Sequence, residues 1–333
     1  MNILYLGEFN GTSQHRADAL VRLGHQVKIA NPAAFLPKNR LIAKWQRETG
    51  GLFLENYLNR RLIFSLEQEK FDLVFVNGGT LVGAALVQEL KKYARAVVNY
   101  NNDDPFGGRD RNLWRLYLQA VPYYDLLVVV RESNVSEAYS LGAKKVSRVF
   151  MSADELAHRP RLLTNEDYIQ WANDVLFIGT WMPERGAFMA ALLEAGVPLT
   201  IYGDRWQKAK EWSVIRKAWK GEALYGDDYA KAIQSAKISL GLLSKGNRDL
   251  HTQRSLEIPF LGGLLCAERT SEHLRLYPEG AVFWSDVTEC IEICNMLLRN
   301  DEERQEISRK GRERCIQNQL LNESIMRQIL SKI

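Results

Sequence analysis

Two neighbouring carboxylates, Asp103 and Asp104, are the first residues of this sequence whose types and spacing suit chemistry. They follow the apolar segment 96–100 after Asn101 and Asn102, and they precede a proline and two glycines. Carboxylates held at the end of a strand can deprotonate a hydroxyl, bind one, or hold a metal ion. An Asx-turn that leads into the next helix is the structural alternative. We expect one of the two to be a general base, with His15 as a further catalytic candidate.

A second polar turn follows the apolar segment 2–7. It places Gly11, Thr12 and Ser13 at the start of a predicted helix. The turn lacks the G-x-G-x-x-G dinucleotide fingerprint, because Phe9 stands where the backbone would have to approach a pyrophosphate. A nicotinamide dehydrogenase is therefore disfavoured. The three polar-turn residues either cap the helix or contact a ligand.

The segment 246–263 contains the densest set of ligand-binding residue types in the chain. A helix that begins inside it would present free N–H groups and a positive dipole end to an anion. Thr252 and Ser255 can cap that helix, and Arg254 adds positive charge. Glu257 lies one turn further, where its carboxylate can accept hydrogen bonds from a sugar diol. The structural alternative is a capped helix with incidental charges.

A third turn follows the predicted strand 174–179. Gly179 ends the strand, Thr180 lies in a short polar loop, and Arg185 falls in the first turn of the next helix. Backbone N–H groups and an arginine at such a place favour a phosphate. A solvated arginine is the alternative.

These segments resemble the group-1 glycosyltransferases of the GT-B fold, and within them the CgeB/YkvP spore-protein-like branch. The motifs that carry the resemblance are LGHQV at 23–27, DDP at 103–105, IGTWMPER at 178–185, YGDRW at 202–206, and the segment 251–268. The resemblance covers most of residues 1–310. It implies that the N-terminal domain takes the acceptor and the C-terminal domain takes the nucleotide sugar.

The resemblance also implies roles for individual residues. Glu257 matches the glutamate that binds the donor ribose, and Arg185 matches a basic residue at the diphosphate. Asp249 stands where many relatives carry a glutamate and is one methylene shorter, which weakens any role in gripping the sugar. The full implied donor set is Gly179, Thr180, Arg185, His251, Thr252, Arg254, Ser255 and Glu257, with Leu224, Tyr225 and Asp228 near the base. The family reaction implies no metal and no cofactor, with UDP as the default nucleotide.

Composition excludes several classes of protein. The chain has 333 residues, of which 46% are hydrophobic and 25% charged, as in packed globular proteins. No apolar run is long enough to span a membrane, and no signal peptide follows Met1. The net charge of +4 is too mild to indicate a nucleic-acid partner. Basic residues interleave with Trp206, Trp212 and Trp219, but a helix with a tryptophan core face explains them better.

Four cysteines without a C-x-x-C pair predict neither a disulfide scaffold nor a metal site. They are Cys266, Cys290, Cys294 and Cys315. We expect them to be small buried hydrophobic residues in a reducing cytoplasm.

Strand and helix patterns alternate twice along the chain, which predicts two doubly wound, Rossmann-like α/β domains facing a cleft, as in GT-B proteins. The C-terminal helices are expected to pack back on the first domain. The predicted divisions are an acceptor domain at 1–155, a linker at 156–173, a nucleotide-sugar domain at 174–310 and a C-terminal helix at 311–333.

The sequence therefore predicts a bacterial, cytoplasmic glycosyltransferase that acts on an acceptor hydroxyl of a sugar, a lipid-linked molecule or a protein. Retention of configuration is what the resemblance favours, whereas an aspartate base suits inversion. The segment 35–61 holds six basic and two acidic residues among apolar ones. It predicts an acceptor-site wall or a peripheral contact with the inner membrane face. The alternatives are a nucleotide-sugar 2-epimerase and a non-catalytic spore-coat or assembly protein with a vestigial donor site.

Overall fold

The chain forms two units, each built on one six-stranded sheet, in a computed structural model that describes residues 1–333. Unit 1 comprises Met1–Asp154, Lys245–Asp249 and Asn322–Ile333, and unit 2 comprises Glu155–Ser244 and Leu250–Leu321. The α/β class with two doubly wound domains is thus confirmed.

The sheet of unit 1 is parallel throughout, with the order β2-β1-β3-β4-β5-β6. Its strands are β1 (Asn2–Leu6), β2 (Gln26–Ala30), β3 (Phe71–Asn77), β4 (Ala94–Asn101), β5 (Leu126–Val129) and β6 (Val146–Arg148). From β1 the chain goes to β2 on one side and to β3 on the other. In open parallel sheets a crevice forms at such a switch point, beyond the carboxyl ends of the strands.

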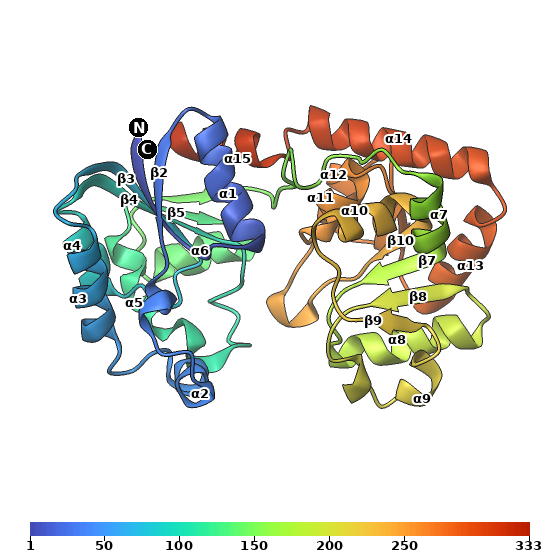
Figure 1. The fold of residues 1–333 in the computed structure, drawn as a ribbon, viewed down its shortest axis with the longest axis horizontal. Coiled ribbons are helices and arrows are strands. Elements are labelled where there is room, and N and C mark those ends of the chain that lie inside the picture. The colour runs from blue at the N-terminus through green and yellow to red at the C-terminus, as the bar shows by residue number, and fades with distance from the viewer. The chain divides into compact units, whose positions relative to one another are not determined.

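The helices of unit 1 connect these strands on both faces of the sheet (Figure 1). They are α1 (Gly11–Arg22), α2 (Arg40–Thr49), α3 (Glu55–Ser65), α4 (Ala84–Leu90), α5 (Arg115–Ala120), α6 (Glu132–Ser140) and α15 (Asn322–Leu330), with 3-10 turns at Pro32–Phe35, Arg111–Trp114 and Val121–Tyr123. The last helix, α15, returns to unit 1 and packs along α1. Arg22 on α1 ties the two helices together with a 2.8 Å ion pair to Glu323.

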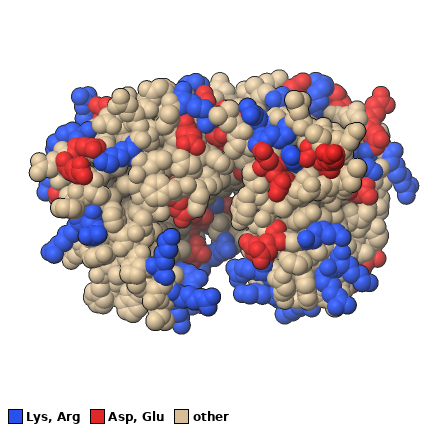
Figure 2. All heavy atoms as spheres, in the orientation of Figure 1, with Lys and Arg blue, Asp and Glu red and all other residues tan.

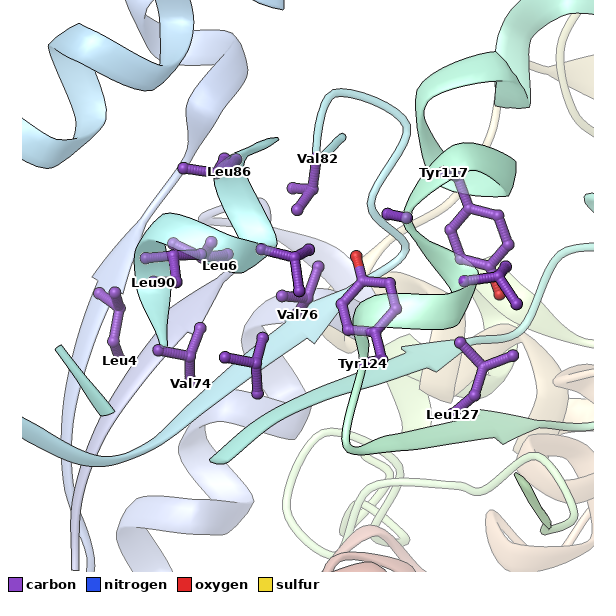
Figure 3. Packing of buried hydrophobic residues seen from close by; sticks show 14 of the residues in the cluster. Leu4, Leu6, Val74, Val76, Val82, Leu86, Leu90, Tyr117, Tyr124 and Leu127 are labelled. Atoms are coloured by element: carbon purple, nitrogen blue, oxygen red, sulfur yellow. The ribbon is translucent and has the colours of Figure 1, made fainter. Parts of the chain in front are cut away.

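The core of unit 1 follows from strands that are apolar on both faces, as central parallel strands are. Leu4 and Leu6 of β1 lie with Val74 and Val76 of β3 in a buried cluster that includes residues of α4 and α5 (Figure 3). On the other face of the sheet Tyr5 stacks on Phe75, and Phe75 stacks on Tyr100 of β4. Each such side chain contributes about 1.5–3 kcal/mol by leaving water.

The sheet of unit 2 is also parallel, with the order β12-β11-β10-β7-β8-β9. Its strands are β7 (Asn173–Ile178), β8 (Leu199–Tyr202), β9 (Trp219–Gly221), β10 (Ala236–Gly241), β11 (Leu265–Glu268) and β12 (Val282–Trp284). The first strand, β7, lies between β8 and β10. The switch point of this sheet is therefore the boundary between β7 and β10.

The helices of unit 2 include a long C-terminal one. They are α7 (Asn165–Trp171), α8 (Pro183–Glu194), α9 (Trp212–Ile215), α10 (Gly226–Ser235), α11 (Arg254–Phe260), α12 (Ser271–Leu276), α13 (Val287–Leu297) and α14 (Asp301–Gln317), with a 3-10 turn at Trp206–Lys208. The stretch predicted as a linker contains α7, which Thr164 starts through a capping box with Asp167. Three helices form from residue 287 to the end of the chain: α13, α14 and, in unit 1, α15. Asn300 separates the first two by capping α14.

The tryptophans of unit 2 belong to its core. Trp206 is fully buried, and the rings of Trp212 and Trp219 meet edge to face with centroids 5.7 Å apart. These rings pack against the apolar cluster of unit 2, so the predicted core role is confirmed. The predicted single helix is wrong, because Trp206 lies in a 3-10 turn, Trp212 on α9 and Trp219 on β9.

The basic segment 35–61 covers α2 and most of α3. Leu41 and Trp45 on α2 are exposed, and Lys and Arg side chains gather at this end of unit 1 (Figure 2). None of the helices is both long and apolar enough to cross a bilayer.

Candidate functional sites in the two units

A cavity of about 450 Å³ opens at the switch point of unit 1, which is the size of many small-molecule sites. Its floor is formed by the residues that follow β1, β3 and β4, and the start of α1 lies against it. The lining includes Gly7, Glu8, Gly11, Thr12, Ser13, Arg16, Asn77, Gly78, Gly79, Asn102 and Asp103. The predicted ligand loop of Gly11, Thr12 and Ser13 thus lies at a cavity, although α1 starts at Gly11 with no side-chain cap from Asn10.

Asp103 lines this cavity directly after β4. An Asx-turn holds its backbone, because its N–H donates to Asn101 Oδ1 at 2.9 Å. The protein that surrounds the recess reduces hydration of the carboxylate and raises its pKa, while Arg131 and Arg16 act in the opposite direction. A carboxylate with a raised pKa is a better general base near neutral pH.

Asp104 occupies a different environment and is not part of the cavity lining. Its carboxylate accepts from Arg248 Nε at 2.6 Å, from Asn134 Nδ2 at 2.9 Å and from the N–H of Gly107 at 3.1 Å. Burial opposes ionisation, but the hydrogen bonds from Arg248 and Asn134 lower the pKa of Asp104. The two aspartates predicted as equivalent candidates are therefore distinct, and this geometry favours a structural role for Asp104.

The cavity also contains a residue that sequence reasoning missed. His15 was predicted to face the site, whereas its neighbour Arg16 lines the cavity and is only 1% exposed. Arg16 Nη1 donates to Asn77 Oδ1 at 3.0 Å, and the guanidinium lies 4.6 Å from the centroid of the Tyr100 ring. Its Nε and Nη2 atoms have no hydrogen-bond partner. An arginine in the second turn of the helix that follows β1 was the signal that could have found it.

The segment 245–249 belongs to unit 1, although its neighbours along the chain belong to unit 2. Arg131 forms a buried ion pair with Asp249 and donates from Nε to Asn247 O at 2.6 Å. Arg248 adopts a left-handed backbone with φ of 54° and bonds Asp104 and Glu137. Asp249, for which the sequence already weakened a role in gripping the donor sugar, has its carboxylate directed at Arg131.

In unit 2, Arg185 fills the space at the switch point between β7 and β10. It is 7% exposed and donates to the carbonyl of Thr180 at 2.8 Å. Its Nη2 donates to the carbonyls of Leu242 and Leu243 at 3.3 and 3.2 Å, and its guanidinium lies 5.5 Å from the Phe177 ring. These bonds hold the loop at Gly179 and Thr180 and the loop after β10. The Nη1 and Nη2 atoms of Arg185, which was predicted to contact a phosphate, therefore already donate to backbone carbonyls.

Glu257 lies on α11 and is 6% exposed. Tyr229 donates its hydroxyl to Glu257 Oε2 at 2.6 Å, and His158 Nε2 lies 3.4 Å from Oε1. Each carboxylate oxygen can accept more than one hydrogen bond, so ribose hydroxyls could still bind. The predicted ribose role of Glu257 stays a prediction.

The start of α11 is organised by a buried serine–histidine pair. His273 Nδ1 lies 2.7 Å from the carbonyl of Glu268, so Nδ1 carries the proton and Nε2 accepts. Ser255 therefore donates its hydroxyl to His273 Nε2 at 2.8 Å, and the same oxygen accepts the N–H of Thr252. Burial lowers the pKa of His273 to about 4 and keeps it neutral. The Thr252 side chain therefore does not cap α11 as predicted; its backbone N–H donates to Ser255 Oγ instead.

The other predicted donor residues lie in the segments that lead into α10 and α11 or begin these helices. His251 is buried and bonds Glu272 at 2.5 Å. Arg254 begins α11, is half-buried, and its Nε has no hydrogen-bond partner. The predicted base pocket of Leu224, Tyr225 and Asp228 lies at the start of α10, where Tyr225 is 77% exposed.

Three of the four cysteines meet in the core of unit 2. The sulfur atoms of Cys266 on β11 and of Cys290 and Cys294 on α13 lie within 4.8 Å of one another. All three residues are fully buried in the apolar cluster, as predicted for small hydrophobic side chains. Hydrogen bonds from the neighbouring thiols and burial raise the pKa of Cys266.

Comparisons with known proteins agree with this architecture. Residues 185–331 match the glycosyl transferase-like family. No curated protein has a significantly similar sequence.

Solved structures share the fold at low sequence identity. Sucrose-phosphate synthase from Thermosynechococcus elongatus has a TM-score of 0.72 at 10% identity, covering 99% of this chain and 98% of the other. Anabaena HepE, solved in complex with UDP-glucose, has a TM-score of 0.70 at 11% identity, covering 100% and 99%. A Listeria monocytogenes protein described as a UDP-N-acetylglucosamine 2-epimerase has a TM-score of 0.57 at 10% identity, covering 93% and 90%. The chain thus has the GT-B fold, and its residues 185–331 are similar to the glycosyl transferase-like family.

Proposed function

We propose that the protein transfers a sugar from a nucleoside diphosphate sugar to an acceptor hydroxyl. The observation that carries this proposal is the family match over 185–331, because that range contains the polar residues gathered at the carboxyl end of the second sheet. HepE has the same fold and was solved with UDP-glucose, so UDP is the nucleotide that we expect.

For the donor, we assign the nucleotide sugar to unit 2. Arg254 has an N–H group without a partner at the start of α11, which suits a diphosphate oxygen. Glu257 would accept from the ribose hydroxyls while Tyr229 and His158 hold its carboxylate in place. Tyr225 offers an exposed ring for the base. Donors aimed at the leaving diphosphate would stabilise its developing charge.

For the acceptor, we assign the cavity of unit 1. Asp103 lines it, and the reduced hydration that raises its pKa suits a base that takes the proton of an attacking hydroxyl. The family resemblance favours retention, whereas direct attack assisted by Asp103 would invert the configuration. The anomer of the product, read by NMR, separates these two stereochemical outcomes.

The first test is nucleotide binding. We expect thermal stabilisation by UDP or another nucleoside diphosphate, by about 2.7 kcal/mol at a hundred times its dissociation constant. The panel of UDP, GDP, dTDP and ADP is run with EDTA and with Mg²⁺, and equal shifts in both would support binding that needs no metal. If no nucleotide binds, the chain is better explained as a non-catalytic binding protein.

A matched pair of variants tests the ribose assignment. Glu257→Gln should weaken UDP binding by about ten- to a hundredfold, because a hydrogen bond to a charged group contributes about 1.5–3 kcal/mol. Glu194→Gln removes an exposed carboxylate from the same unit and should leave binding unchanged. Unchanged UDP affinity in Glu257→Gln would refute the assignment.

Product analysis separates transfer from epimerisation. Incubation of the preferred UDP-sugar without acceptor should leave the configuration at C2 of the sugar unchanged, as seen by NMR. Conversion to the C2 epimer would show the 2-epimerase activity instead.

The exposed apolar and basic surface of α2 makes peripheral membrane contact a further part of the proposal. Sedimentation with vesicles of phosphatidylglycerol, compared with neutral phosphatidylcholine vesicles, tests it. Binding to anionic vesicles that Trp45→Ala weakens would support it.

A further inference from the structure

The cavity of unit 1 contains a buried positive charge whose hydrogen-bonding capacity is only partly used. Arg16 is 1% exposed, and of its guanidinium only Nη1 has a hydrogen-bond partner, Asn77 Oδ1. A buried charge without full compensation is costly to the folded state. A buried polar group of this kind calls for an explanation, and a ligand that supplies the missing partner is one.

The two unused atoms have a geometry of their own. Nε and Nη2 lie on the same edge of the guanidinium plane, where their N–H groups point in parallel. This edge forms the fork that binds two oxygens of one carboxylate or phosphate. A single neutral hydroxyl would satisfy only one of the two donors.

The surroundings of Arg16 hold this edge in place. Asn77 at the end of β3 accepts from Nη1, and the guanidinium lies over the Tyr100 ring. Gly78 and Gly79 follow β3 with φ of 76° and 102°, and they line the same cavity. The N-terminus of the 12-residue α1 adds N–H groups that no side chain caps.

We propose that the cavity of unit 1 binds an acceptor that carries a phosphate ester or a carboxylate, which Arg16 holds through its Nε and Nη2 edge. This inference rests on the proposed function and defines the acceptor's chemical class. The same cavity contains Asp103, so one ligand would present its anionic group to Arg16 and a hydroxyl to the carboxylate.

The test compares anionic and neutral sugars on matched variants. Glucose 6-phosphate, glucuronate, inorganic phosphate and glucose are titrated calorimetrically into wild type, Arg16→Gln and Arg61→Gln. Arg61 is an exposed arginine of α3 in the same unit, so its loss changes the net charge equally. UDP is titrated into all three proteins separately.

We expect an anionic probe to bind wild type at least tenfold more tightly than glucose. Arg16→Gln should lose about ten- to a hundredfold of that affinity, and Arg61→Gln should retain it. Arg16→Lys keeps the charge without the fork and should fall between wild type and Arg16→Gln. The larger loss of affinity in Arg16→Gln, for glucose 6-phosphate or for glucuronate, shows whether the site prefers a phosphate ester or a carboxylate.

Three outcomes would overturn the inference. The first is equal binding of glucose and both anionic sugars to wild type. The second is an equal loss in Arg16→Gln and Arg61→Gln, which would indicate general electrostatics. The third is a comparable fall of UDP affinity in Arg16→Gln, which would assign the anion to the donor. Failure of UDP to bind wild type would instead refute the proposed function. Intact UDP affinity in Arg16→Gln shows that the variant is folded.

Discussion

Two buried arginines occupy corresponding places in the two units, and they are used differently. Arg16 lies on the helix that follows β1, and Arg185 lies on the helix that follows β7. Each guanidinium is placed over an aromatic ring of its own sheet, Tyr100 or Phe177. Arg185 donates to three backbone carbonyls, whereas Arg16 donates to a single side chain.

The difference shows how one fold can use its switch point in two ways. In unit 2 the arginine bonds the loops after β7 and β10, and the groups that we propose bind the donor lie further along the chain, on α10 and α11. In unit 1 the crevice stays open as a cavity, and the arginine contributes to its wall. An arginine at the same topological position is thus a structural residue in one unit and a binding candidate in the other.

The largest expected effect concerns the open cavity. Asp103→Asn should lower turnover by about 10²- to 10⁴-fold, because an amide cannot accept the acceptor's proton. The affinity for the donor nucleotide and the free energy of unfolding should stay unchanged, because the carboxylate lines a cavity. Steady-state kinetics and calorimetry measure both. Full activity in Asp103→Asn would show that the cavity is not the reaction site.

A paired substitution tests the comparison of the arginines directly. Arg185→Met should lower the free energy of unfolding by about 3 kcal/mol or more, because three carbonyls lose a charged donor. Arg16→Met should leave it unchanged or raise it, because removing an incompletely compensated buried charge relieves a cost. Urea denaturation measures both. Equal destabilisation would show that Arg16 is also a structural residue.

The sequence predicted the fold well because the fold depends on local patterns. Short apolar runs that end in glycine, such as 2–7 and 174–179, mark central parallel strands whatever their neighbours are. Elements with weaker patterns were missed. The short strand β9 and helix α7 have little periodicity of their own and depend on packing in unit 2. By contrast, α15 packs on unit 1 through α1, as expected for the C-terminal chain.

The candidate site was predictable only in part, because partners far apart in sequence decide what a side chain does. Asp103 and Asp104 are adjacent and chemically identical, yet only Asp104 meets Arg248, which lies 144 residues away. Likewise, nothing in the local sequence shows that Cys266 joins Cys290 and Cys294. Arg16 was missed although it directly follows the candidate His15, because adjacent side chains on a helix point about 100° apart and the local sequence does not show which of them lines the cavity.

The buried Ser255–His273 pair of unit 2 leads us to predict a pH-dependent stability. The pKa of His273 is about 4 in the folded state and near 6.5 when unfolded, so the unfolded chain binds the proton more tightly. Stability is therefore complete above pH 6.5 and falls as the pH decreases from 6.5 towards 4, by up to about 3 kcal/mol. His273→Gln should show a smaller loss between pH 7 and 5 by urea denaturation. An unchanged pH dependence would contradict the assignment.

The smallest expected effect, on the free energy of unfolding, distinguishes Asp104 from its neighbour Asp103. Asp104→Asn should cost about 1–2 kcal/mol of unfolding free energy, because it weakens the bond to Arg248, whose side chain is 40% exposed and can be rehydrated. Glu137→Gln, a more exposed partner of the same arginine, should cost less than about 1 kcal/mol. Donor binding and turnover should persist in Asp104→Asn at a temperature where the variant is folded. A large loss of turnover with unchanged stability would instead make Asp104 the base. The distinction between the cavity-lining carboxylate of Asp103 and the ion-paired carboxylate of Asp104 would then be wrong.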